Sequence, residues 1–164
     1  LRLVSSVPLV IDADAINILS ENKTWLSFIP KHSIFTPHPK EFERLAGKSF
    51  DNFERFQMQV AFAKKYQVYV ILKGAHTCIA CPDGEVFFNS TGNPGMATGG
   101  SGDVLTGIIS GLIAQGLSVP EAARLGVFLH GLAGDIKAEE KGTLPLIASD
   151  VLDGIPEAVK RITW

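Results

Sequence analysis

The apolar positions of this chain fall into short runs separated by polar and turn-forming residues. Runs at 7–11 and 68–72 predict buried strands, because strands of a parallel sheet are apolar on both faces, and the segment at 33–36 predicts a further strand. Two further runs, at 77–80 and 85–89, are joined by a Pro-Asp-Gly turn and predict a hairpin. The pattern therefore predicts a mostly parallel sheet that carries one antiparallel hairpin.

Apolar residues at helical spacing mark the segments between and after these runs. The segments predicted to be helical are 15–19, 39–46, a segment near 52–66 whose cap is Asp51 or Asn52, 102–115, 120–139 and two closing segments that begin near 148 and 156. Pro39 and Pro120 suit the first position of a helix, and Gly47 suits a helix end. The buried face of the helix at 52–66 is expected to comprise Phe53, Phe56, Val60 and Ala63. Strands that alternate with helices predict one α/β domain.

Length and charge narrow the class of protein. The chain has 164 residues, which fits a single domain, and a net charge of −2 with scattered Lys and Arg. This charge gives no electrostatic footprint for nucleic acid or for an anionic membrane. The apolar stretches are shorter than the ~18 residues that a membrane span needs, and the first residues lack the layout of a signal peptide. We therefore expect a soluble, cytoplasmic protein that binds neither nucleic acid nor membranes.

Cys78 and Cys81 form a lone Cys-x-x-Cys motif, which raises a redox or zinc interpretation. Residues three apart in a strand point to opposite faces, however, and the chain has no second cysteine pair to complete a zinc site. We expect both thiols to be packed in the core.

A glycine-rich turn precedes the helix predicted at 102–115. Gly99, Gly100 and Gly102 surround Ser101, so backbone N–H groups can converge there on an anion, and the helix N-terminus favours negative charge. Asp103 falls in or beside the first helical turn. A carboxylate at this position is either an ordinary helix cap or a group that serves the bound anion.

Polar residues follow the predicted strands at their carboxyl ends, where ligands bind in sheets of this kind. They are Asp12, Asp14, Asn17, His38, Lys73, Thr77 and, before the glycine-rich turn, Asn93. Each also has a structural interpretation. Asp12 and Asp14 can cap the following helix, and Lys73 can be a solvated charge. His38 lies between two prolines, which suits a presented side chain or simply a rigid turn. Their convergence predicts a ligand site.

Four sequence blocks, taken together, resemble the ADP- or ATP-dependent NAD(P)H-hydrate dehydratases of the ribokinase-like superfamily. The blocks are DADAIN at 12–17, TPHPKEF at 36–42, LKGAHT at 72–77 and NPGMATGGSGDVLTG at 93–107. The resemblance implies a ribokinase-like three-layer sandwich with helices on both faces of the sheet. Domains of this family are considerably longer. The resemblance therefore implies that residues 1–164 are the C-terminal part of a larger dehydratase domain, truncated at its N-terminus.

The resemblance also implies a reaction that repairs hydrated NADH and NADPH. ADP or ATP phosphorylates the hydroxyl of the hydrated ring, and phosphate then leaves to restore the double bond. Asp103 would be the base that accepts the hydroxyl proton. The N–H groups of Gly100, Ser101 and Gly102 would form the anion hole around the transferred phosphoryl group.

Binding residues follow from the same resemblance. The nucleotide is assigned to Lys73, Gly74, Ala75, His76, Thr77 and Gly102. The hydrated dinucleotide is assigned to His38, Asp103, Asn93 and Asp14. Mg²⁺ is expected to accompany the nucleotide without a metal cage of protein ligands. A homo-oligomer is expected, as is an NAD(P)H-hydrate epimerase domain that is fused to this domain or acts beside it.

Two other functions stay open at this point. A ribokinase-like kinase of a vitamin precursor would use the same anion hole and Asp103, but it would release a stable phosphorylated product. A non-catalytic nucleotide-binding or assembly module would bind nucleotide without turnover. The block at 93–107 favours the dehydratase.

Overall fold

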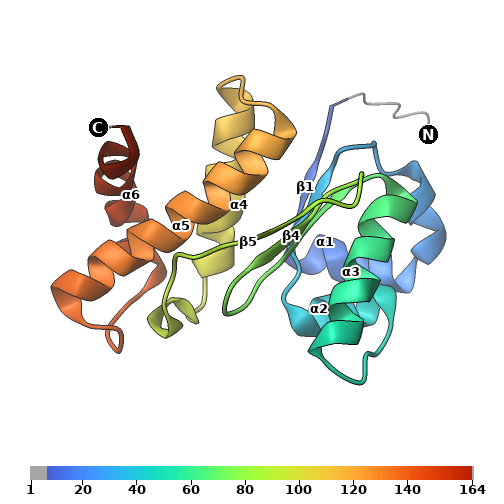
Figure 1. Ribbon diagram of the computed structural model, residues 1–164, viewed down its shortest axis with the longest axis horizontal. Coiled ribbons are helices and arrows are strands. Elements are labelled where there is room, and N and C mark those ends of the chain that lie inside the picture. The colour runs from blue at the N-terminus through green and yellow to red at the C-terminus, as the bar shows by residue number, and fades with distance from the viewer. Residues whose placement is uncertain (1–6, 164) are drawn as a thin grey trace. The chain divides into compact units, whose positions relative to one another are not determined.

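The computed structural model describes residues 7–163 and consists of two compact units (Figure 1). The first unit holds the described residues up to Gly74 together with Cys78–Phe88. The second unit holds Ala75–Thr77 and the chain from Asn89 onward. A cluster of buried apolar side chains lies within each unit.

The strands belong to the first unit and form one sheet. In spatial order they are β1 (Val10–Ile11), β2 (Ile34–Phe35), β3 (Tyr69–Leu72), β4 (Cys78–Ala80) and β5 (Val86–Phe88). The pairs β1–β2 and β2–β3 are parallel, whereas β3–β4 and β4–β5 are antiparallel. Among the described strands only β4 therefore runs against the others. The predicted hairpin is confirmed. The strand predicted at 7–11 is shorter, because its ladder with β2 pairs only two residues.

The helices of the first unit are α1 (Ala13–Glu21), the 3₁₀ helix η1 (Lys23–Phe28), α2 (Pro39–Ala46) and α3 (Asn52–Tyr66). Pro39 opens α2 and Gly47 follows its last residue, as predicted. Buried side chains of the helices, such as Ile16 and Phe62, join Val70 of β3 in one apolar cluster. Helix α3 packs against β3 and β4.

The buried face of α3 differs from the predicted one. Ala63 is buried as predicted, whereas Phe53 is 66% exposed. The residue Gln59 is fully buried instead, and its Nε2 donates to the backbone oxygens of Val70 and Cys78, each at 2.9 Å. A polar side chain thus anchors the helix to β3 and β4, which the spacing of apolar residues does not reveal.

Both cysteines are free and buried, which confirms their packing role. Burial raises the pKa of the Cys78 thiol to about 11, although a hydrogen bond with Gln59 acts in the opposite direction. Across residues 7–163, no cluster of three or more His, Cys, Asp and Glu side chains could hold a metal ion.

The second unit is built from the 3₁₀ helix η2 (Pro94–Met96) and from α4 (Ser101–Ala114), α5 (Val119–Lys141) and α6 (Ala148–Thr163). Helix α5 packs against both α4 and α6 (Figure 1). Gly131 of α5 lies directly against Thr91, since a Cβ on it would be 2.7 Å from the Thr91 carbonyl carbon. The small residue lets the segment before η2 approach the helix backbone.

The last helix corrects a prediction. Two segments were expected near 148 and 156, but α6 continues through Pro156 as one helix. Proline removes one helical hydrogen bond and clashes with the preceding turn. Val151 and Ala158, on either side of it, are both buried in the cluster that includes Leu129 and Ala133 of α5. Packing on both sides of the proline holds the helix together.

The start of α5 lies one residue earlier than predicted. The helix begins at Val119, which places Pro120 at its second position instead of its first. Ser118 precedes it in a capping box with Glu121, whose carboxylate accepts the Ser118 backbone N–H at 3.0 Å. This reciprocal cap fixes the start of the helix.

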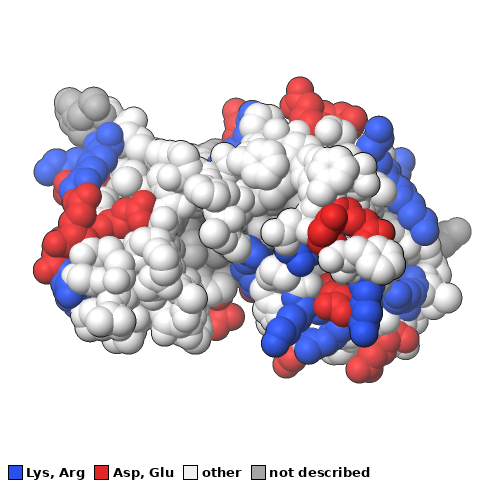
Figure 2. Space-filling view, turned by 60° about the horizontal axis from the view of Figure 1, so that its bottom comes forward, with Lys and Arg blue, Asp and Glu red and all other residues white. Residues whose placement is uncertain are grey.

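The described helices include none that is long and apolar enough to cross a membrane. On the face shown in Figure 2, acidic and basic side chains are interspersed.

Candidate functional site

The glycine-rich turn ends at the cap of α4. Gly100 is the N-cap residue and has a left-handed backbone, with φ 86° and ψ −13°. A Cβ at this position would be strained by its backbone and would lie 3.1 Å from the Cβ of Ala148. Asp103 lies exposed in the first turn of the helix, and the cap is Gly100. The capping interpretation of Asp103 is therefore wrong, and its carboxylate is presented to solvent at a helix N-terminus, where negative charge is favoured.

The predicted anion-hole donors differ in what they already bind. The Ser101 N–H donates to the Thr98 oxygen at a long 3.3 Å. Gly102 is the second residue of α4, so its N–H has no acceptor within the helix. Ser101 is buried and contacts His130 of α5. The His130 Nε2 lies 2.9 Å from the backbone carbonyl oxygen of Ser101 and 3.2 Å from its side-chain Oγ.

Asn93 is held by a carboxylate that the sequence did not indicate. Its Oδ1 accepts the Gly95 N–H at 3.0 Å and caps η2, while its Nδ2 donates to Oδ1 of Asp135 at 2.9 Å. The other oxygen of Asp135 accepts the Gly92 N–H at 2.7 Å. Both oxygens of this α5 side chain thus fix the turn before the glycine-rich segment.

In the first unit, polar residues after three different strands meet. The ammonium nitrogen of Lys73 lies 2.8 Å from Oδ1 of Asp12 and 3.9 Å from Oε2 of Glu41. Asp12 precedes α1 as its N-cap residue but makes no side-chain cap hydrogen bond. Asp12 thus occupies the predicted N-cap position, but its carboxylate pairs with Lys73 instead of capping the helix. The solvated-charge interpretation of Lys73 does not hold, because its ammonium group is paired. The predicted meeting of polar residues at the carboxyl ends of the strands is confirmed for Asp12 and Lys73.

His38 and Glu41 cap α2 reciprocally. The His38 Nδ1 accepts the N–H groups of Lys40 and Glu41 at 3.1 and 3.2 Å, and Oε2 of Glu41 accepts the His38 N–H at 2.7 Å. Because Nδ1 accepts, the neutral ring carries its proton on Nε2, which lies 3.5 Å from Oε1 of Glu41. The Glu41 side chain is buried and was not singled out from the sequence. The His-x-x-Glu spacing of a capping box was its only signal.

The other predicted residues have simpler settings. Asp14 is exposed in the first turn of α1. Asn17 accepts a hydrogen bond from Nη1 of Arg44 at 2.8 Å, which ties α1 to α2. Gly74 is the last residue of the first stretch of chain in the first unit, whereas Ala75, His76 and Thr77 belong to the second unit. The predicted nucleotide residues are thus divided between the units.

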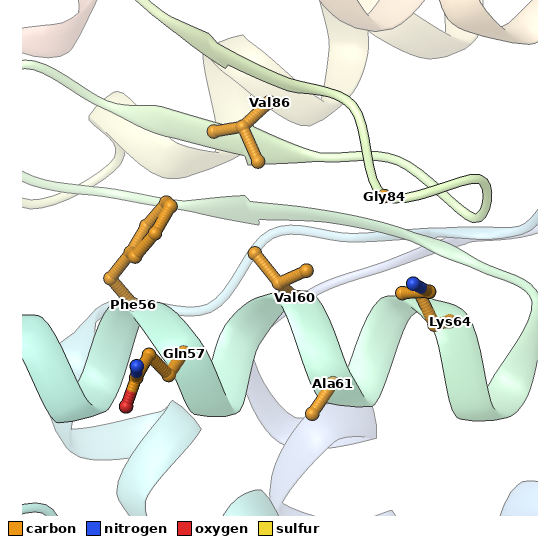
Figure 3. Close-up of a pocket in the computed structure, with 7 residues that line it drawn as sticks. All are labelled: Phe56, Gln57, Val60, Ala61, Lys64, Gly84 and Val86. Atoms are coloured by element: carbon orange, nitrogen blue, oxygen red, sulfur yellow. The ribbon is translucent and has the colours of Figure 1, made fainter.

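One open groove of about 410 Å³ lies elsewhere in the first unit. Phe56 and Val60 point from α3 toward the strand that carries Val86 (Figure 3). The remaining lining residues are Gln57, Ala61, Lys64 and Gly84. The groove is mostly apolar, and it contains none of the residues predicted from the sequence to bind nucleotide or dinucleotide.

Comparison with solved structures defines the class of protein as ribokinase-like. A ribokinase-like superfamily protein from Enterococcus faecalis is 32% identical, with a TM-score of 0.77 over 93% of this chain and 52% of that one. The ADP/ATP-dependent NAD(P)H-hydrate dehydratase of Bacillus subtilis, co-crystallised with ATP and Mg²⁺, is 32% identical. Its TM-score is 0.83 over 98% of this chain and 57% of that one. These similarities confirm the predicted fold class.

The family profile described as NAD(P)H-hydrate dehydratase matches residues 2–157. The chain belongs to this family, as the sequence blocks indicated. The bifunctional NAD(P)H-hydrate repair enzyme Nnr of Moorella thermoacetica is 46% identical over 95% of this chain and 30% of its own length. The ADP-dependent (S)-NAD(P)H-hydrate dehydratase of Neisseria meningitidis is 43% identical over 95% of this chain and 54% of its own length. The chain thus spans about a third to a half of these curated relatives.

Proposed function

We propose that this chain carries the catalytic part of a nucleotide-dependent dehydratase that repairs hydrated NADH and NADPH. The observation that carries the proposal is the N-terminus of α4, where an exposed carboxylate, Asp103, follows a glycine-capped turn. The family match over residues 2–157 supports this chemistry. Residues 1–164 are proposed to be the C-terminal part of the dehydratase domain.

The proposed reaction has two stages. Asp103 accepts the proton of the ring hydroxyl as its oxygen attacks the terminal phosphoryl group of ATP or ADP, and ADP or AMP leaves. The N–H groups of Gly100, Ser101 and Gly102 stabilise charge on the transferred group. In the second stage the C–O bond of the phosphate ester breaks and phosphate takes the electron pair. A proton lost from the adjacent carbon then allows the ring double bond to form.

The binding assignments are part of the proposal. Lys73 and Gly74, with Ala75, His76, Thr77 and Gly102, contact the nucleotide. His38, Asp103, Asn93 and Asp14 contact the hydrated dinucleotide. The Bacillus subtilis relative was co-crystallised with ATP and Mg²⁺. Mg²⁺ is proposed to be held mainly by the nucleotide phosphates, as is usual in phosphoryl transfer.

The setting of the enzyme is proposed as well. Relatives described as bifunctional repair enzymes support an epimerase partner for the same damaged cofactor, in the same chain or a separate one. A cytoplasmic location is proposed, because the substrate arises where NADH and NADPH are used. A homo-oligomer is proposed from the resemblance to the family alone.

The test is recovery of near-ultraviolet absorbance when ADP or ATP is added to hydrated NADH or NADPH, with the protein expressed from its complete natural coding sequence. D103N should abolish turnover while nucleotide binding persists, because the amide keeps the shape but cannot accept the proton. D153N, which changes an exposed carboxylate on α6, is the matched control and should behave as wild type.

Each of the other functions predicts a different result. A stable phosphorylated product without absorbance recovery would indicate the kinase. Nucleotide binding without any turnover by the wild type would indicate the binding module. Either outcome would refute the dehydratase.

A further inference from the structure

The contact between His130 and Ser101 has a defined polarity. A backbone carbonyl oxygen can only accept a hydrogen bond, so the His130 Nε2, 2.9 Å away, must be the donor. The ring proton therefore sits on Nε2 and is shared with Oγ of Ser101 at 3.2 Å. A side chain of α5 thus holds the first peptide group of α4.

The held peptide group is the one that carries the Gly102 N–H. In a planar trans peptide the carbonyl and the following N–H point in opposite directions. A hydrogen bond that fixes the Ser101 carbonyl therefore also fixes the direction of the Gly102 N–H. As the second residue of the helix, Gly102 directs this N–H out of the helix end.

The packing of α4 against α5 holds this contact in place. Ser101, Leu105 and Ile109 recur every fourth residue and form the buried face of α4. Gly126 lies one turn before His130 on α5, and a Cβ on it would lie 2.7 Å from Cγ1 of Ile109. The missing side chain lets the two helices approach closely, so that the imidazole reaches the start of α4.

We propose that His130 is a positioning residue, which aims the Gly102 N–H at the phosphoryl group and acts without touching the substrate. The inference rests on the proposed function for its kinetic consequence, although the orientation of the peptide group can be tested without it. It assigns a role to a histidine that sequence reasoning did not single out.

The kinetic test compares H130A, H130Q and L132A in the complete natural protein. H130A should lower kcat by about 10- to 100-fold, less than the 10²–10³-fold typical when an oxyanion donor is removed outright. The KM for nucleotide should stay within about threefold, because most nucleotide contacts are unchanged. H130Q retains an N–H donor and should recover most of the lost kcat. L132A removes packing from a half-buried residue of the same helix and should lower only the melting temperature.

A structural readout separates this inference from the proposed function. In ¹H–¹⁵N spectra without ligand, H130A should shift the Gly102 amide and speed its hydrogen exchange, whereas L132A should leave that amide unchanged. If the wild type shows no dehydration but the Gly102 amide responds as expected, the proposed function fails and the positioning role stands. An unchanged Gly102 amide in folded H130A, or a wild-type kcat in H130A, would overturn the positioning role.

Discussion

The ammonium nitrogen of Lys73 lies 2.8 Å from the carboxylate of Asp12, so one ion pair joins the residues that follow β3 and β1. These strands do not pair with each other, because β2 lies between them. The Lys73 side chain is 23% exposed and that of Asp12 is 10% exposed. A phosphate bound by Lys73 would therefore compete with a partner already in place.

We expect this pair to stabilise the first unit. K73A and D12N should each lower the free energy of unfolding by about 1–3 kcal/mol, between the values typical of exposed and buried pairs. The double variant should cost less than the sum, with a coupling of at least about 0.5 kcal/mol. Urea unfolding measures the free energy of unfolding of the two single variants and of the double variant. Strictly additive losses would show that the pair contributes nothing.

Glu41 should matter more than its neighbour on the same helix. E41A removes the acceptor for the His38 N–H and should cost about 1 kcal/mol, the usual value of a helix cap. Because His38 is proposed to contact the dinucleotide, E41A should also raise the KM for that substrate. E41Q, which keeps an acceptor oxygen, should be milder. E43A changes an exposed residue of α2 and is the control. Equal effects of E41A and E43A on stability and KM would contradict this role.

Gly100 should tolerate no side chain. In G100A the left-handed backbone and the approach to Ala148 should together cost about 1–3 kcal/mol. The helix start would shift and kcat should fall. G99A adds its methyl where no atom lies within 4 Å and should cost less stability. Thermal unfolding compares the two, and equal melting temperatures would count against a special requirement at position 100.

Two helical glycines should respond in opposite directions. A methyl on Gly131 would collide with the backbone of Thr91, so G131A should lose about 2 kcal/mol or more. Gly111 of α4 has open space around it, so G111A should gain about 0.5–1 kcal/mol from helix propensity. Chemical denaturation of both variants checks the contrast. A stable G131A would show that the segment before η2 does not pack against α5 as described.

The buried thiol of Cys78 should make stability fall at alkaline pH. Its pKa is raised from 9.0 to about 11, so between these values the unfolded chain loses the proton while the folded protein keeps it. The free energy of unfolding should therefore decline as pH rises from 9 toward 11. C78A should remove this part of the decline in denaturant titrations across that range. An unchanged slope in C78A would assign the decline to other groups.

The local elements could be predicted from the sequence because they depend on neighbouring residues. The apolar run at 68–72 predicted β3, and Pro39 with Gly47 predicted the ends of α2. The four sequence blocks likewise identified the family, since the residues within each block are neighbours in the sequence. The prediction for α6 failed because of distant contacts: the helix continues through Pro156 because buried residues on both sides of it pack in one core.

The candidate site also combines features that neighbouring residues determine with features that depend on distant contacts. The sequence by itself determined the glycine-rich turn and placed Asp103 in the first turn of a helix, since both follow from backbone preferences of adjacent residues. Only the tertiary structure decided that His130 holds Ser101 and that Asp135 holds Asn93, partners 29 and 42 positions away. A hydrogen bond between residues so far apart leaves no periodic trace in the sequence, because it arises only when packed helices bring the two groups within 3 Å or so of each other.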